Sequence, residues 1–171
     1  MTLRRGLVFS SSRLLVFAAV LLSGCRYGFA GGGLPPSIRT VAIIPFENET
    51  ASSDLPRELT DALREALEKR LGLKAAVEEK ADAVLRGKIV RYDLDVPIAV
   101  SADRRQATSS RRQLVIVLDV ELVNQADGKV LWQRSGLEGK GEYPENGEAS
   151  GRKQAIERIV SDVIEGAQSQ W

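Results

Sequence analysis

Two segments of the chain repeat apolar residues at helical spacing along a single stripe, and the segments between them repeat apolar residues at every second position. A helix with one apolar stripe buries that stripe against another element, and an alternating strand buries one face of a sheet. The chain therefore folds as helices laid on a sheet. The two stripes consist of Leu59, Ala62, Leu63, Ala66, Leu67 and Leu71, and of Ala155, Ile156, Ile159, Val160, Val163, Ile164 and Ala167.

The alternation of apolar and polar residues marks the strands. A short apolar run at 41–44 ends at Pro45, residues 83–94 alternate in part, and the hairpin signal Asp127-Gly128 precedes a returning strand at 130–134. The clearest strand spans residues 114–123, since its alternate positions are all apolar. Its inward face consists of Leu114, Ile116, Leu118, Val120 and Leu122.

The order β-α-β-β-β-α predicts an α+β fold, namely a two-layer sandwich in which a four-stranded mixed sheet carries both helices on one face. The first strand, the first helix and the second strand form a parallel crossover unit, and the last three strands form an antiparallel meander. The opposite face of the sheet carries Val115 and Val117 together with Val90 and Tyr92. We expect that face to meet water or a partner.

The N-terminus has the pattern of an export signal. Three arginines precede a nine-residue apolar run at 14–22, which as a helix is about 14 Å long and cannot cross a hydrocarbon core of about 30 Å. This run is typical of a signal-peptide core. The following Leu22-Ser23-Gly24-Cys25 resembles the lipobox of bacterial lipoproteins, in which the cysteine receives lipid. The alternative is an ordinary secretory signal followed by a free cysteine, which is a liability in an oxidising compartment.

These features divide the chain into three parts. We expect a lipoprotein signal peptide at 1–24, the lipidated Cys25 with a Gly/Pro-rich tether at 25–40, and the α+β domain at 41–171. Several acyl chains on one cysteine anchor a domain to a membrane surface without spanning it. Arg26 stands where an aspartate would retain a lipoprotein in the inner membrane, so we expect the periplasmic face of the outer membrane.

Composition excludes several classes of site. The chain has no histidine and one cysteine, which rules out an intrachain disulfide, a Cys/His zinc site and a Cys–His or Ser–His catalytic pair. Removing residues 1–24 takes away three arginines and no acids, leaving 21 basic and 23 acidic residues, so nucleic acid is not an expected partner. We expect no cofactor and no metal.

A carboxylate-pair enzyme is the remaining catalytic alternative. Asp93 and Asp95, and likewise Asp119 and Glu121, share one face of a predicted strand, as two acids of a glycosidase would. Alternating acids on a half-exposed strand more commonly form its polar face, and catalysis needs a perturbed group in a pocket. The chain is therefore not expected to be an enzyme.

The residues after the lipobox resemble a known family. Cys25-Arg26-Tyr27 is followed by a glycine-rich link and by Leu34-Pro35-Pro36-Ser37-Ile38-Arg39-Thr40-Val41-Ala42-Ile43-Ile44-Pro45-Phe46-Glu47-Asn48-Glu49-Thr50. This is similar to the opening of the LPS-assembly lipoprotein LptE family, with Arg26 in place of the family's glycine. The resemblance implies an outer-membrane lipoprotein that plugs the LptD β-barrel and with it inserts lipopolysaccharide into the outer leaflet.

Related openings occur in lipoproteins of other function. An apolar strand followed by Pro-Phe-x-Asn is also found in activators of peptidoglycan synthases and in the curli-secretion channel family. The activators tend to carry a long tether, whereas here about 15 residues separate Cys25 from the first strand and reach at most roughly 50 Å. The short tether favours a partner in the same membrane.

A basic cluster lies in the loop at 101–112, between the second and third strands. It contains Arg104, Arg105, Arg111 and Arg112. Guanidinium groups bind phosphate bidentately, so the cluster is a candidate site for the phosphates of lipopolysaccharide. The alternative is a solvated hairpin loop without a specific ligand, and no family motif maps onto these four positions.

Overall fold

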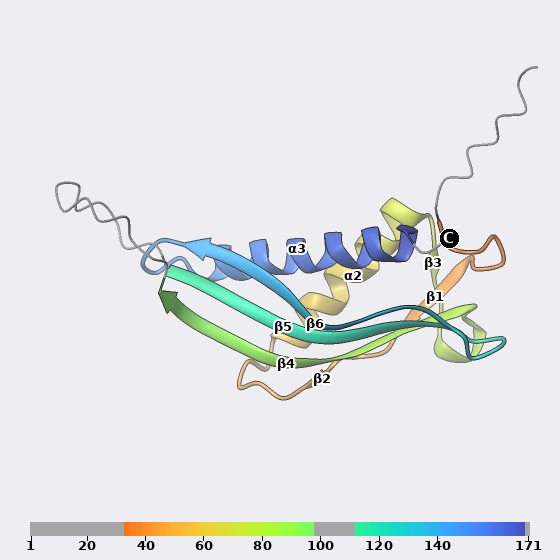
Figure 1. The fold of residues 1–171 in the computed structure, drawn as a ribbon, viewed down its shortest axis with the longest axis horizontal. Helices are drawn as coiled ribbons and strands as arrows, with labels where there is room; N and C mark the ends of the chain where they lie inside the picture. Colours follow the sequence, from red (N-terminus) through yellow and green to blue (C-terminus); the bar gives the residue numbers. More distant parts are fainter. Residues whose placement is uncertain (1–32, 98–111, 170–171) are drawn as a thin grey trace, which may run out of the picture. The chain divides into compact units, whose positions relative to one another are not determined.

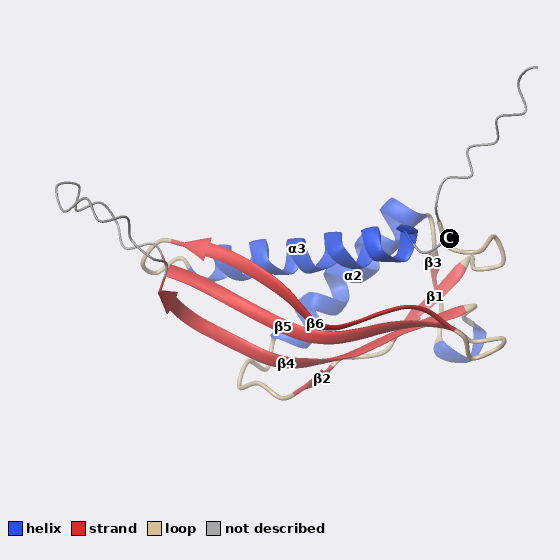
Figure 2. Ribbon diagram, viewed as in Figure 1, coloured by secondary structure: helices blue, strands red, loops and turns tan. Residues whose placement is uncertain are grey.

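The computed structural model describes residues 33–97 and 112–169, which form a layer of two helices packed on a mixed sheet (Figures 1 and 2). The two helices cover the same face of the sheet, as the single apolar stripe of each predicts. The elements are β1 (Thr40–Ile43), β2 (Glu47–Asn48), α2 (Leu55–Leu71), β3 (Lys74–Ala75), the 3-10 turn η1 (Glu78–Lys80), β4 (Ala83–Pro97), β5 (Arg112–Asn124), β6 (Val130–Tyr143) and α3 (Glu148–Ser169).

The sheet has the order β3-β1-β4-β5-β6, with β2 paired to β4 beyond the end of β1. β1 lies parallel to β4, with Val41 opposite Ala83, and β4, β5 and β6 are antiparallel. The α+β class, the parallel crossover and the meander are thus confirmed. The sheet has six strands rather than four, because β2 and β3 contain two residues each and are too short to show alternation.

One continuous core joins the sheet to both helices. The inward residues of β5 expected from alternation, from Leu114 to Leu122, are all buried within it. Ile38, which precedes β1, is buried as well, and Leu34 packs against the same core. The chain is therefore already part of the folded layer before its first strand begins. The helical members of this core include Leu55, Leu59, Leu63 and Leu67 from α2 and Ala155, Ile159, Val163 and Ile164 from α3.

The two ends of α2 are closed in different ways. The helix ends at Leu71, and Gly72 adopts the left-handed conformation (φ 69°) and donates its N–H to the Glu68 carbonyl oxygen, as expected of a terminating glycine. Asp54 precedes the first turn but forms no capping bond through its side chain. The preceding loop is instead held by Asn48, whose Oδ1 accepts hydrogen bonds from the backbone and hydroxyl of Thr50.

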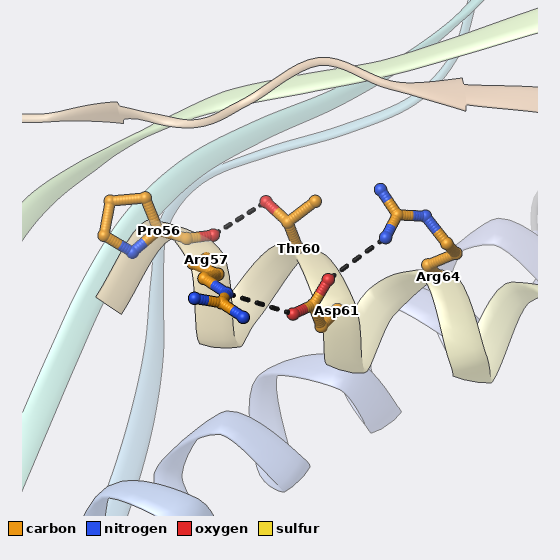
Figure 3. Close-up of polar contacts among 5 residues, drawn as sticks. All are labelled: Pro56, Arg57, Thr60, Asp61 and Arg64. Carbon is orange, nitrogen blue, oxygen red and sulfur yellow. Dashed lines mark hydrogen bonds and ion pairs between the residues drawn. The ribbon is translucent and has the colours of Figure 1, made fainter. Parts of the chain in front are cut away.

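The outward face of α2 carries exposed charges in short-range pairs (Figure 3). Asp61 lies 3.0 Å from Arg64 and 3.9 Å from Arg57, and the Thr60 hydroxyl donates to the Pro56 carbonyl oxygen. Exposed pairs of this kind contribute between about 0 and 1 kcal/mol each. They solvate the helix, and we assign them no role in binding.

Phe46 fixes the segment between β1 and β2 against the sheet. Its side chain is 4% exposed, and the surface that receives it is provided by Gly87 of β4. A Cβ atom at Gly87 would lie 2.7 Å from Phe46 Cε1 and would overlap the Asp119 carbonyl oxygen. The Pro-Phe-x-Asn-x-Thr stretch is therefore structural: its phenylalanine anchors the chain, and its asparagine shapes the loop into α2.

Candidate functional site

The arginine-rich segment connects β4 to β5, and the structure places its last member. Arg112 begins β5, opposite Pro97 of β4 and Tyr143 of β6. Its Nη2 atom lies 3.4 Å from Glu145 Oε1. The other three arginines, Arg104, Arg105 and Arg111, lie outside the described residues, and so does Cys25. The described part of this cluster is one guanidinium at the end of the sheet, next to a carboxylate.

A polar cluster joins β4 to the first turns of both helices. The Tyr92 hydroxyl donates a 2.8 Å hydrogen bond to Glu148 Oε1 of α3. Arg152 lies 3.8 Å from the same carboxylate and 2.9 Å from Glu58 of α2. Burial, together with the carboxylate of Glu148, raises the pKa of Tyr92 to about 12. The cluster ties three elements together through one phenol, two carboxylates and one guanidinium.

Tyr92 lies on the helix side of the sheet, so the prediction that it belongs to the opposite face is wrong. The register between β4 and β5 shifts between Ile89 and Arg91, and Val90 is the extra residue. Ile89 and Tyr92 consequently face the helices although they are three positions apart. Strict alternation cannot reveal this shift, and the four clustered side chains come from three separate elements of the chain.

The opposite face of the sheet meets solvent through charged residues and through Val90, which is 39% exposed, rather than through its two valines on β5. Val115 and Val117 are only 6% and 8% exposed, contrary to the expectation that they meet water or a partner. In the strand register, Val117 lies between Arg91 and Glu138, whose side chains approach to 3.7 Å across β5. The aliphatic stem of the arginine thereby shields the valine from water.

Two further charged side chains, Asp93 and Lys140, complete this cover. Val115 lies between Asp93 of β4 and Lys140 of β6 in the register. Lys140 Nζ is 2.9 Å from Glu138, and Asp93 is 3.3 Å from Arg91. These four side chains form a lattice of alternating charge above the two valines. A lattice that already pairs its own charges presents no unpaired basic group to an anionic ligand on this part of the face.

The acids considered for catalysis take part in the same sheet. Asp93 pairs with Arg91, Glu121 lies 2.6 Å from Arg86, and Asp119 accepts a 2.8 Å hydrogen bond from the Gly136 N–H. The side chain of Asp95 is outside the described part of the chain. Among the residues that the structure describes, no three His, Cys, Asp or Glu side chains gather in a way that would hold a metal ion.

Two hollows lie on opposite surfaces of the described domain. One, of 470 Å³, lies on the solvent side of the sheet and is lined by charges of both signs, including Glu47, Arg86 and Lys88. The other, of 740 Å³, runs between α2 and α3 over an apolar floor that includes Ala62 and Val160. Within the described ranges, no helix is long and apolar enough to cross a bilayer.

Comparison with known proteins links the domain to one family and to several solved folds. A family model described as "LptE: Lipopolysaccharide-assembly" matches residues 38–168. Protein XCC0632 from Xanthomonas campestris has a similar fold, with a TM-score of 0.56 and 12% identity over 81% of this chain and 90% of that chain. No curated protein matches the chain.

Two further solved structures show the same arrangement of sheet and helices. The PelC dodecamer from Paraburkholderia phytofirmans has a TM-score of 0.53 and 16% identity, covering 81% of this chain and 94% of that chain. Protein CT253 from Chlamydia trachomatis has a TM-score of 0.50 and 10% identity, covering 75% and 96%. At such identities the likeness concerns the fold alone.

Proposed function

Because the chain belongs to the LptE family of lipopolysaccharide-assembly proteins, we propose that it plugs and helps assemble an LptD-type β-barrel and takes part in inserting lipopolysaccharide into the outer leaflet. The observation that supports this is the family match over residues 38–168, which runs from before β1 into the last turn of α3. The proposed role involves no catalysis, since the acids on the described strands, Asp93, Asp119 and Glu121, bind neighbouring groups of the sheet.

We further propose that the domain is held on the periplasmic face of the outer membrane by lipid on Cys25. Leu34 packs against the core of the domain, so the nine steps from Cys25 to Leu34 span at most about 32 Å when extended. A domain on so short a tether stays next to its own membrane, where a barrel partner would be. Labelled palmitate should enter the wild-type protein and not Cys25→Ser, and equal labelling of both would contradict this anchor.

The arginine-rich segment is our proposed site for the phosphates of lipopolysaccharide. The support is its charge, with four arginines within nine residues of a mature chain that carries 21 basic and 23 acidic residues. Arg112 is placed at the end of the sheet, where it faces Glu145, so a phosphate would compete with that carboxylate for its guanidinium. The cluster would thus hold a phosphorylated ligand at one end of the sheet.

Two charge-reversal variants test this site. Arg104→Glu with Arg105→Glu, and separately Arg111→Glu with Arg112→Glu, should weaken lipopolysaccharide binding without lowering the melting temperature. A matched control is Arg57→Glu with Arg64→Glu, because both arginines are exposed on the outward face of α2. Binding unchanged in both loop variants, or reduced equally in the control, would remove the loop from the site.

The proposed partner is tested by co-purification in detergent. The full chain should co-purify with the LptD-type barrel of the same organism, and its depletion should lower surface lipopolysaccharide and leave the barrel misassembled. A change confined to peptidoglycan crosslinking would instead support the alternative of a peptidoglycan-synthase activator. Co-purification with a secretion pore would support the secretion-channel alternative.

A further inference from the structure

The last strand of the sheet has a free edge. β6 pairs with β5 and, among the described residues, with no other strand. The N–H of Glu142 donates to Gln154 Oε1 of α3, at 3.4 Å, and so points away from β5. Alternate residues of an antiparallel strand direct their backbone groups to the same side. The N–H and C=O groups of Glu138 and Lys140 therefore also point to the free edge.

A groove runs along this edge. It has a volume of 660 Å³, and its walls are β6 on one side and α3 on the other. One end is marked by the bulge at Ser135 and Gly136, where the β5–β6 register shifts, and the other by the bond from Glu142 to Gln154. The helix wall is polar, which suits an extended polypeptide better than an apolar helix. It consists of Gln154, Glu157, Arg158, Ser161 and Asp162.

The position of α3 determines what can occupy the groove. A Cβ atom at Gly139 would overlap the Ala155 carbonyl oxygen, and one at Gly141 would overlap the Gly151 carbonyl oxygen. The backbone of α3 therefore lies directly over β6. If two copies paired through this edge, their α3 helices would be one strand spacing apart, about 4.8 Å, whereas packed helices need about 8–10 Å. A second copy whose α3 lies on the same side of the joined sheet is excluded on steric grounds.

We propose that the free edge of β6 binds an extended segment of the barrel partner by strand addition. The added strand carries no helix on the α3 side, and its backbone pairs with the N–H and C=O groups of Glu138 and Lys140. Its side chains beside Glu138 and Lys140 are polar, because the charges of those two residues already pair with each other. The identity of the partner rests on the proposed function, whereas the free edge of β6 is observed in the structure independently of it.

The experiment compares amide exchange in the free full chain and in its complex with the co-expressed LptD-type barrel. The amides of Glu138 and Lys140 should exchange fast in the free chain and be slowed about tenfold or more in the complex. The amides of Leu137, Gly139 and Gly141 point toward β5 and should be protected in both. Unchanged exchange at Glu138 and Lys140 in an intact complex would overturn the edge proposal while leaving the proposed function in place.

A pair of variants at one position provides the second readout. Lys140→Pro removes an N–H that points to the edge and leaves the β5–β6 ladder intact, whereas Lys140→Ala removes the charge and keeps that N–H. Lys140→Pro should weaken the complex about tenfold relative to Lys140→Ala, as expected for one lost hydrogen bond. Equal affinities would refute strand addition. If Lys140→Pro does not fold, the exchange measurement decides, and a wild-type chain that forms no complex overturns both proposals.

Discussion

Removing the phenyl ring of Phe46 tests the structural account of the Pro-Phe-x-Asn-x-Thr stretch. The ring is 4% exposed and belongs to the main core, where it lies against Gly87. Phe→Ala changes at such sites cost about 3–5 kcal/mol, from lost burial and from the cavity left behind. Since a domain of this size has about 5–15 kcal/mol of stability in total, Phe46→Ala should lose a large fraction of it.

The assay is urea denaturation of the mature chain, with thermal unfolding beside it. A loss of about 3–5 kcal/mol corresponds to a fall in melting temperature of roughly 10–20 °C for a domain of this length. Val77→Ala is the matched control, because Val77 is 61% exposed and its truncation should change stability by less than about 0.5 kcal/mol. A loss below about 1 kcal/mol for Phe46→Ala would refute the conclusion that the ring anchors this segment.

A double-mutant cycle then locates the contact. Gly87→Ala alone should destabilise the protein, because the new Cβ atom meets both the Phe46 ring and the carbonyl oxygen of Asp119. In the Phe46→Ala background the first clash is gone and the second remains, so Gly87→Ala should cost less there but still be unfavourable. Strict additivity of the two changes would show that the ring does not lie on Gly87.

Three further predictions concern other contacts. Hydrogen bonds from the backbone N–H of Arg39, and then from the hydroxyl and N–H of Thr40, hold the pKa of Asp82 below its usual value. The wild-type protein should therefore lose stability below about pH 4, and denaturation curves of Asp82→Asn should lack that acid-dependent loss. Tyr92, with its pKa raised to about 12, should contribute stability that is full below about pH 10 and lost toward pH 12, and Tyr92→Phe should abolish this alkaline loss in thermal unfolding. Gly141→Ala should push α3 off β6 and lower stability by about 1–3 kcal/mol in urea, whereas an unchanged midpoint would contradict the close approach of helix and strand.

The sequence determined the layers of this protein because its strongest signals are local. A single apolar stripe per helix requires both helices to cover one face, and the alternation from Leu114 to Leu122 assigns the inward face of β5, as the structure confirms. Gly72 predicts the end of α2 because the left-handed conformation there favours glycine. The lipobox at Cys25 and the arginine-rich loop are equally visible in the sequence, and they remain predictions.

Tertiary structure alone decided the features that depend on strand register. Val90 is an extra residue opposite β5, so Tyr92 turns toward the helices, and no periodicity within β4 announces that shift. Val117 is buried because Arg91 and Glu138 meet above it across two strand pairings. The groove at the edge of β6 likewise exists only because α3 lies on that strand. These features arise between segments distant in the chain, where spacing along the sequence carries no information about which side chains meet.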